Sequence, residues 1–325
     1  MLAFISVCLG EDFEVTHYNP EGVFIGTTLL ADMTDYNRPR VVEVDFEGNI
    51  LWEYRLPENI KGTVLDASIL NTGNFLITVR GQGIFEINRN KEMVWRHKDP
   101  GASHDADRLS NGNTLYNLGW TQKGDDVIRE IDPNGKIIWS WNGLSEFDKE
   151  PFSSIDREGW MHANSVSRLQ NGNTLVSIRN FNTIAEIDKN GKAIRKWTFD
   201  SYDKHTRLQT VGKIKGSRNH EPEILQNGNM LLALRRPNRF IEFNTTTEEI
   251  VWSWEHPNGE KELRTNRDAN RLPNGNTLGT AANKIIEISP KGQIVWQILT
   301  SGGTKNRRKF HKAIRIGPNG QAYGG

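Results

Sequence analysis

The sequence predicts an all-β fold, a six-bladed β-propeller with four-stranded blades whose ring is closed by the C-terminal strand. Two repeated elements carry this prediction: a tight turn around Asn-Gly, and a later hairpin whose last strand carries tryptophan. The turns begin roughly 40 to 60 residues apart, which is the spacing of propeller blades. One such sheet cannot bury both of its faces alone, whereas a ring of sheets can, so the repeat favours a closed ring.

The tight turn is the first repeated element. Asparagine and glycine tolerate positive φ angles, and Asn-Gly therefore favours a hairpin turn between two strands. Each copy is expected to join the innermost strand of a blade to its second strand. The copies are Thr72-Gly-Asn-Phe-Leu76, Asn111-Gly-Asn-Thr-Leu115, Asn171-Gly-Asn-Thr-Leu175, Asn227-Gly-Asn-Met-Leu231, Asn274-Gly-Asn-Thr-Leu278 and the weaker Pro318-Asn-Gly-Gln321.

The second repeated element is a hairpin of alternating β pattern that ends in tryptophan. Ile131-Asp-Pro-Asn-Gly-Lys-Ile-Ile-Trp139 and Ile288-Ser-Pro-Lys-Gly-Gln-Ile-Val-Trp296 show it most clearly. Such runs, joined by a turn, predict the third and fourth strands of each blade. The six copies end at Trp52, Trp95, Trp139, Trp197, Trp252 and Trp296.

The two ends of the chain predict how the ring closes. The chain opens inside a blade, with strands expected in residues 22–30 and 41–52. It ends with residues 310–316, which resemble an inner strand without its followers. We therefore expect the C-terminal strand to complete the first blade. The expected organisation is an N-terminal segment, residues 1–20, and one propeller domain, residues 21–325, although length alone would suggest two domains.

Two long inserts, residues 142–160 and 201–219, each precede an inner strand. They are therefore expected on the same face of the disc. Long loops on one face often form a lid or an entrance, although neutral surface decoration is the alternative.

Composition excludes several classes of protein. The chain carries 41 Lys and Arg residues against 40 Asp and Glu residues, a balance that argues against nucleic acid or an anionic membrane as partner. The single cysteine, Cys8, excludes an internal disulfide framework and a cysteine-rich zinc site. No apolar stretch is long enough to span a membrane. Composition does not determine the oligomeric state.

The first ten residues, Met1–Gly10, are apolar but lack the basic region and cleavage site of a complete signal peptide. A first strand, a disordered start and a trimmed export signal all remain open for them.

Polar side chains recur near the start of the inner strands. The position seven residues before the turn holds His104, Asn164, His220 and Arg267 in four blades. His162 lies two residues before Asn164, and His311 heads a similar segment near the C-terminus. Inner strands of a propeller run the same way along the channel, so these residues are expected at one channel mouth. The remaining histidines, His17, His97, His205 and His256, are expected at the surface.

Convergent imidazoles admit two chemistries. They could hold a divalent metal, or one could attack an anionic group while the others are charged or donate hydrogen bonds. Arg179, Arg267 and Arg235, which is followed by Arg236, are expected beside them. Guanidinium groups would repel a metal ion but bind a sulfate or phosphate ester in bidentate fashion. The residues therefore favour an anion site without a metal.

These residues resemble those of a known family, the bacterial arylsulfotransferases of the six-bladed propeller type. The resemblance extends over about residues 41–316 and is most specific in three blades. The segments that carry it are Ser103-His-Asp-Ala-Asp-Arg-Leu-Ser-Asn-Gly-Asn113, Trp160-Met-His-Ala-Asn-Ser-Val166 through Ser177-Ile-Arg179, and Asn219-His-Glu-Pro-Glu-Ile-Leu-Gln-Asn-Gly-Asn229.

The resemblance implies transfer of a sulfuryl group from a phenolic sulfate ester to a phenol, through a sulfohistidine. No nucleotide donor and no cofactor are implied, and the location implied is periplasmic or secreted. By motif position His220 would be the nucleophile and His162 the acid and base. His104, Arg179 and Asn164 would stabilise the charge on the transferred oxygens. Arg267, His311 and Arg235 are assigned to substrate binding.

Two alternatives remain open from the residues. One is a metal-dependent lyase or hydrolase that uses the channel histidines. The other is a propeller without catalytic activity that binds a ligand at its mouth.

Overall fold

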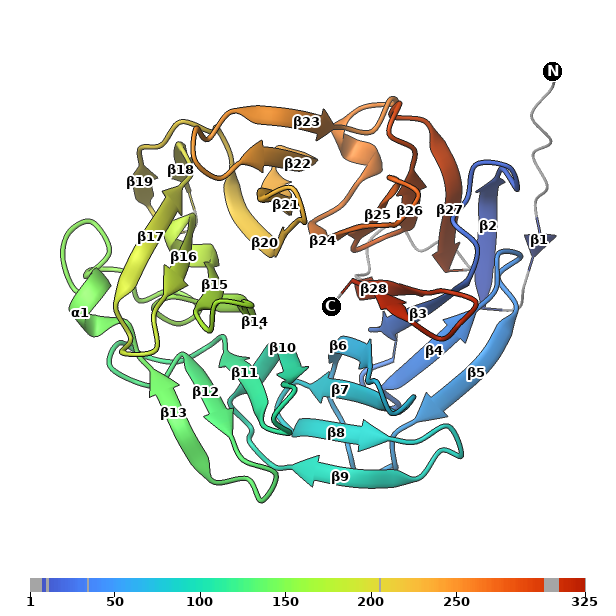
Figure 1. Ribbon diagram of the computed structural model, residues 1–325, viewed down its shortest axis with the longest axis horizontal. Helices are drawn as coiled ribbons and strands as arrows, with labels where there is room; N and C mark the ends of the chain where they lie inside the picture. The colour runs from blue at the N-terminus through green and yellow to red at the C-terminus, as the bar shows by residue number, and fades with distance from the viewer. Residues whose placement is uncertain (1–7, 10–11, 34, 205, 301–309, 325) are drawn as a thin grey trace.

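Six antiparallel sheets surround a central channel in the computed structural model, which describes residues 8–9, 12–33, 35–204, 206–300 and 310–324 (Figure 1). The chain is a six-bladed β-propeller, and the predicted fold class is confirmed. Four blades contain four strands each, ordered below from the channel outward. They are β6 (Val64–Ile69), β7 (Phe75–Val79), β8 (Gly83–Ile87) and β9 (Met93–His97); β10 (Ala102–Arg108), β11 (Thr114–Leu118), β12 (Ile128–Ile131) and β13 (Ile137–Trp141); β14 (Ala163–Arg168), β15 (Thr174–Ile178), β16 (Thr183–Ile187) and β17 (Ala193–Thr198); and β20 (Ser217–Ile224), β21 (Asn229–Arg236), β22 (Asn238–Asn244) and β23 (Ile250–Trp254).

The C-terminal strand closes the ring as predicted. The inner strand of the first blade is β28 (Phe310–Ile316), which pairs with β3 (Thr27–Asp32), and Figure 1 shows this red strand beside the blue one. The blade continues outward through β4 (Arg40–Val44) and β5 (Ile50–Arg55), while β29 (Ala322–Tyr323) pairs with β28 on the other side. The first blade thus combines both ends of the sequence.

The last blade also combines both ends. It contains β24 (Asn266–Arg271), β25 (Thr277–Ala281), β26 (Ile285–Ile288) and β27 (Ile294–Thr300). Its outer edge is extended by β2 (Phe13–Tyr18), which pairs with β27, and then by β1 (Cys8–Leu9). Residues 13–18 of the expected N-terminal segment therefore form a strand of the propeller.

The Asn-Gly turns are tied to the third strand of their blade by a hydrogen bond. Gly112 has a φ of 86°, a left-handed conformation that glycine adopts without strain. The next residue, Asn113, donates from its side-chain amide to Glu130 on β12 at 2.7 Å. The same bond, 2.6–2.7 Å long, joins Asn74 to Glu86, Asn173 to Glu186, Asn229 to Glu242 and Asn276 to Glu287.

Tryptophan side chains link each blade to the next. Each indole N–H donates at 2.9–3.0 Å to a backbone carbonyl in the outer hairpin of the following blade. Three donors, Trp141, Trp197 and Trp254, lie two residues further along the fourth strand than the others. Strand side chains repeat every two residues, so the indoles still lie on the same face of the sheet. The pairs are Trp52 with Arg89, Trp95 with Pro133, Trp141 with Gly191, Trp197 with Thr245, Trp254 with Gly292 and Trp296 with Phe46.

The two inserts contain short elements of their own. The first includes α1 (Leu144–Phe147), and the second includes the hairpin of β18 (Ser201–Asp203) and β19 (Leu208–Thr210). Short 3-10 turns, η1 (Arg179–Phe181) and η2 (Glu260–Glu262), lie elsewhere. In the described part of the chain, no helix has the length and apolar character needed to cross a membrane.

Candidate active site

A register shift within every inner strand shapes the channel. The antiparallel pairing of β10, for example, is interrupted between Ala102 and Ala106, and that of β24 between Asn266 and Asp268. A bulge of this kind changes the direction of the side chains around it. As a result, consecutive residues of one strand, such as His104 and Asp105, line two different cavities along the channel.

The six inner strands therefore carry two layers of side chains. The mouth ring comprises Leu65, His104, Asn164, His220, Arg267 and His311. The acid ring, one residue further along each strand, comprises Asp66, Asp105, Ser165, Glu221, Asp268 and Lys312.

A cavity of about 180 Å³ lies at the mouth ring. Both inserts reach it, through Glu158 and Arg218, so they lie on the same face of the disc. Six of the predicted site residues line it directly, whereas His220 and Asn164 lie buried behind Arg235 and beside each other. The lining residues are Met33, Thr63, Leu65, Arg80, His104, Trp120, Glu158, His162, Arg179, Arg218, Arg235, Arg267 and His311.

The two ring nitrogens of His220 have different partners: Nδ1 is bonded to a backbone carbonyl oxygen, and Nε2 faces a guanidinium group. Its Nδ1 lies 2.7 Å from the carbonyl oxygen of Asn219, which assigns the proton to Nδ1. Nε2 then keeps its lone pair and lies 3.4 Å from Nη1 of Arg235. Asn164 braces this arrangement, because its side-chain amide donates to the same carbonyl oxygen at 2.9 Å.

The ring of His162, like that of His220, has Nδ1 bonded to a backbone carbonyl oxygen, and the backbone of His162 is strained. Its φ is 47°, a left-handed conformation that is costly for a residue with a side chain. Nδ1–H donates to the carbonyl oxygen of Glu158 at 2.7 Å, and Nε2 has no hydrogen-bond partner in the described part of the chain. The ring meets His104 edge-on, with centroids 5.0 Å apart.

His104 belongs to an aromatic stack at the mouth. Its ring lies on Trp120 with centroids 4.7 Å apart, and the guanidinium group of Arg80 lies 3.9 Å from the Trp120 ring centre. Nδ1 of His104 lies 3.1 Å from Oγ of Ser103. The ring of His311 is 5.4 Å from that of His104, and both nitrogens of His311 lack hydrogen-bond partners among the described residues.

The positive charge of the mouth is carried by guanidinium groups rather than by imidazoles. Burial lowers the pKa of all four histidines well below the usual value, and nearby arginines lower it further. The imidazoles are therefore neutral at neutral pH. Burial also lowers the pKa of Arg179 to about 10, although its ion pair with Glu158 opposes this shift. Such a site attracts an anion and offers it neutral nitrogen bases.

Two family models match this chain, over residues 17–204 and 118–301, and both describe arylsulfotransferases (ASST). Each match covers more than half of the sequence. The chain belongs to the arylsulfotransferase family. No curated protein matches it significantly in sequence.

Solved structures similar to this chain show the fold alone, because their sequence identities are low. A protein of unknown function from Bacteroides caccae is 19% identical with a TM-score of 0.61, over 88% of this chain and 97% of its own. A streptogramin B lyase is 13% identical with a TM-score of 0.57, over 97% and 95% of the two chains. A virginiamycin B lyase from Staphylococcus aureus is 14% identical with a TM-score of 0.56, over 91% and 90%.

Several residues that line the mouth cavity were not predicted from the sequence. Arg80 directly follows a second strand, as Arg179 does, so its place in the repeat was a usable signal. Trp120 and Glu158 lie in loops, and Arg218 lies at the start of β20; none of them has a repeated counterpart that could have indicated it. Arg236, expected beside Arg235, instead points to Asp203 at 3.9 Å and has a side chain that is 54% exposed.

The described residues contain no group of three or more His, Cys, Asp or Glu side chains arranged to hold a metal ion. His205 lies outside the described residues.

Proposed function

We propose that this arylsulfotransferase moves a sulfuryl group from a phenolic sulfate ester to a phenol through a sulfohistidine at His220. The observation that supports it best is the pairing of Nε2 of His220 with Arg235, 3.4 Å away. An anion that binds Arg235 would replace the contact of this guanidinium group with Nε2, and would then lie next to a neutral nitrogen that keeps its lone pair. This is the arrangement that nucleophilic attack on a sulfate ester requires.

In the first half-reaction, Nε2 of His220 forms a bond to sulfur while the bond between sulfur and the phenolic oxygen breaks. The phenolate leaves with the electron pair of that bond. A loose transition state spreads negative charge over the peripheral oxygens, where positioned cations stabilise it. Arg179, Arg267 and Arg235 line the cavity, which supports this role for them, and His104 is proposed as a neutral donor or acceptor beside them.

His162 is proposed as the acid and base. In the second half-reaction its unpartnered Nε2 accepts the proton of the acceptor phenol. The phenolic oxygen then bonds to sulfur as the bond between sulfur and His220 breaks. In the first half-reaction, protonated His162 returns a proton to the leaving phenolate. The bound anionic ester favours that protonation because it offsets the charge of Arg179.

Asn164 and His311 have supporting roles in this proposal. Asn164 contacts the carbonyl that holds Nδ1 of His220, so it fixes the direction of the nucleophile. His311 lines the cavity and has two ring nitrogens available for substrate oxygens.

The test is turnover of para-nitrophenyl sulfate with phenol as acceptor, followed by release of coloured nitrophenol. His220→Ala is expected to abolish phenol-dependent release, and His162→Ala to slow it by about 10²–10⁴, the usual range for general acid–base catalysis. His17→Ala, on the outer strand β2, serves as the matched control and should retain full activity. Full activity of His220→Ala would overturn the assignment.

A further inference from the structure

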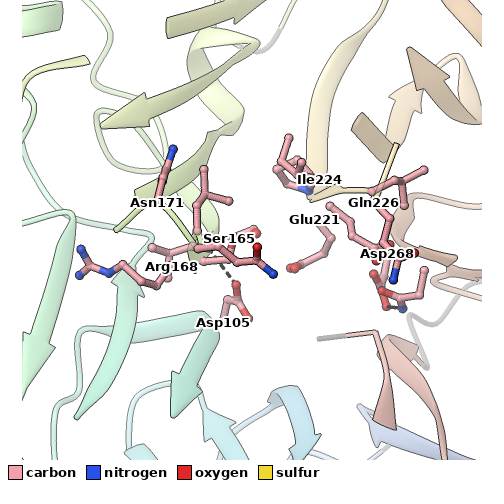
Figure 2. Close-up of a pocket in the computed structure, with 16 residues that line it drawn as sticks. Asp105, Ser165, Arg168, Asn171, Glu221, Ile224, Gln226 and Asp268 are labelled. Atoms are coloured by element: carbon pink, nitrogen blue, oxygen red, sulfur yellow. Dashed lines mark hydrogen bonds between the residues drawn. The ribbon is translucent and has the colours of Figure 1, made fainter. Parts of the chain in front are cut away.

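A second, larger cavity of about 530 Å³ lies at the opposite end of the channel (Figure 2). The mouth cavity is lined by residues near the start of the inner strands, whereas this one is lined by their later residues and by the Asn-Gly turns. It lies between β14 and β20. The acid ring forms its inner end through Asp105, Ser165, Glu221 and Asp268.

The acid ring has more carboxyl groups than cations. Its single cation is Lys312, which is 2% exposed and lies 2.9 Å from Asp105, 3.1 Å from Asp66 and 3.6 Å from Glu221. With Asp268, four carboxyl groups thus face one ammonium group. Buried carboxylates are costly unless a cation or hydrogen-bond donors compensate them.

Some of these carboxyl oxygens join neighbouring blades. Asp66 accepts a hydrogen bond from the backbone N–H of Ala106 at 3.2 Å, and Asp105 accepts one from Val166 at 2.8 Å. The carboxyl group of Asp268 accepts from the backbone of Ala313 in the next blade, and its Oδ2 accepts from Asn270 on its own strand at 2.8 Å. These contacts explain why acidic residues occupy the ring.

Two carboxylate oxygens of the acid ring, both on residues that line the cavity, lack hydrogen bonds of this kind. Oε1 of Glu221 and Oδ1 of Asp268 have no hydrogen-bond partner within the described ranges. The two residues are only 8% and 1% exposed. Figure 2 shows Glu221 extending from its strand into the gap across from Asp105 and Ser165.

We propose that this cavity binds a small organic cation, a primary amine on an apolar body, with its ammonium group between Glu221 and Asp268. Lys312 shows that the ring accommodates a primary ammonium group. The volume lies within the range of small-molecule sites. Beyond the carboxylates the wall is largely apolar and includes Val166, Leu169, Pro222, Ile224 and Leu225.

The carboxylate oxygens of this cavity do not form a suitable site for a metal ion. Calcium takes six to eight oxygen ligands, whereas this cavity offers two unpartnered carboxylate oxygens. Arg168 also lines the cavity, but it is paired with Glu130 at 2.6 Å and so leaves the acid ring uncompensated.

The charged groups around the cavity determine how binding depends on pH. Burial raises the pKa of Asp66 and Asp268 to about 6, and that of Glu221 and Asp107 well above the usual values. A cation binds the ionised carboxylates, so its affinity should rise as pH rises through this range. The groups that face the site are Asp66, Asp105, Asp107, Glu221, Glu223, Asp268, Lys312 and, at the rim, Arg168.

The test is titration calorimetry with phenethylamine, using phenethyl alcohol as the neutral isostere and phenylpropionate as the anion. We expect saturable one-site binding of the amine only, at least tenfold tighter at about pH 8 than at about pH 5 because the carboxylates ionise. Glu221→Gln and Asp268→Asn should each weaken it at least tenfold. Glu92→Gln, in an exposed hairpin, is the matched control and should bind normally.

Two results measured on the unaltered protein would overturn the proposal: equal affinity for the amine and the alcohol, or an amine affinity that does not change with pH. These measurements do not depend on whether the variants fold. Tight binding of calcium that excludes the amine would overturn the ligand class. Circular dichroism checks the fold of each variant. This site is independent of sulfuryl transfer at the mouth, so the two proposals succeed or fail separately.

Discussion

The chemistry proposed at the channel mouth depends on a neutral imidazole, His220, that lies among guanidinium groups. His220 is 1% exposed, and its pKa is lowered first by burial and then by Arg235 and Arg267. Protonation would add a positive charge to a site that already holds several. The lone pair on Nε2 is therefore retained at pH values where an exposed histidine would lose it.

The pH dependence of the first half-reaction follows from this shift. A lowered histidine pKa keeps the nucleophile neutral. With para-nitrophenyl sulfate, whose nitrophenolate can leave without a proton from His162, kcat/KM should therefore stay level between about pH 8 and the usual histidine pKa of about 6.5, and fall only below it. It should fall again near pH 10, where Arg179 loses its proton. A profile of kcat/KM against pH checks both limbs. An inflection centred on the usual histidine value would contradict the account.

Glu158 is the acidic side chain that the first insert places at the mouth. It pairs with Arg179, the residue proposed to bind the sulfate ester, and its side chain is 42% exposed. Glu158→Gln should therefore lower the KM for the donor, by roughly threefold given the modest strength of a partly exposed ion pair. Glu150→Gln in the same insert is the control. An unchanged KM in Glu158→Gln would show that the carboxylate does not compete with the donor.

At the scale of strands, the inner-strand bulge limits what the sequence can predict. The mouth ring was predictable because His104, His220 and Arg267 share one offset from the Asn-Gly turn. The acid ring was not predictable from the sequence. In a regular strand, successive side chains point to opposite faces, so the neighbour of a channel-facing residue, such as Asp105, would be expected to point away from the channel. The hydrogen bond between the asparagine that follows the turn glycine and a glutamate of the third strand was also not predictable, because it depends on how the strands of the blade pair.

The tryptophan bonds between blades give a prediction about stability. Trp141 donates to the carbonyl of Gly191 at 2.9 Å, whereas Trp139, on the same strand, is half-buried beside Arg168. Trp141→Phe should lower the free energy of unfolding by about 1 kcal/mol more than Trp139→Phe, the worth of one hydrogen bond. Urea unfolding of the two variants measures the difference. Equal losses would mean that the indole bond contributes nothing beyond packing.

The whole ring brings together residues that are distant in the sequence. Its six-fold repeat and its closure by β28 could be predicted because both depend on local turn and strand patterns. The loops at the mouth could not be predicted, because Trp120 and Glu158 are placed by tertiary packing rather than by the repeat. The net charge of +1 conceals an axial separation, with arginines at one end of the channel and carboxylates at the other.

We propose that His220 carries the sulfuryl group between donor and acceptor. The most direct test is mass spectrometry of the protein after mixing with para-nitrophenyl sulfate in the absence of an acceptor. We expect one sulfuryl group per chain on the peptide that contains His220, and we expect it to be lost when phenol is added and to be absent from His220→Ala. Steady turnover without a modified histidine, or a sulfuryl group on another residue, would contradict this proposal.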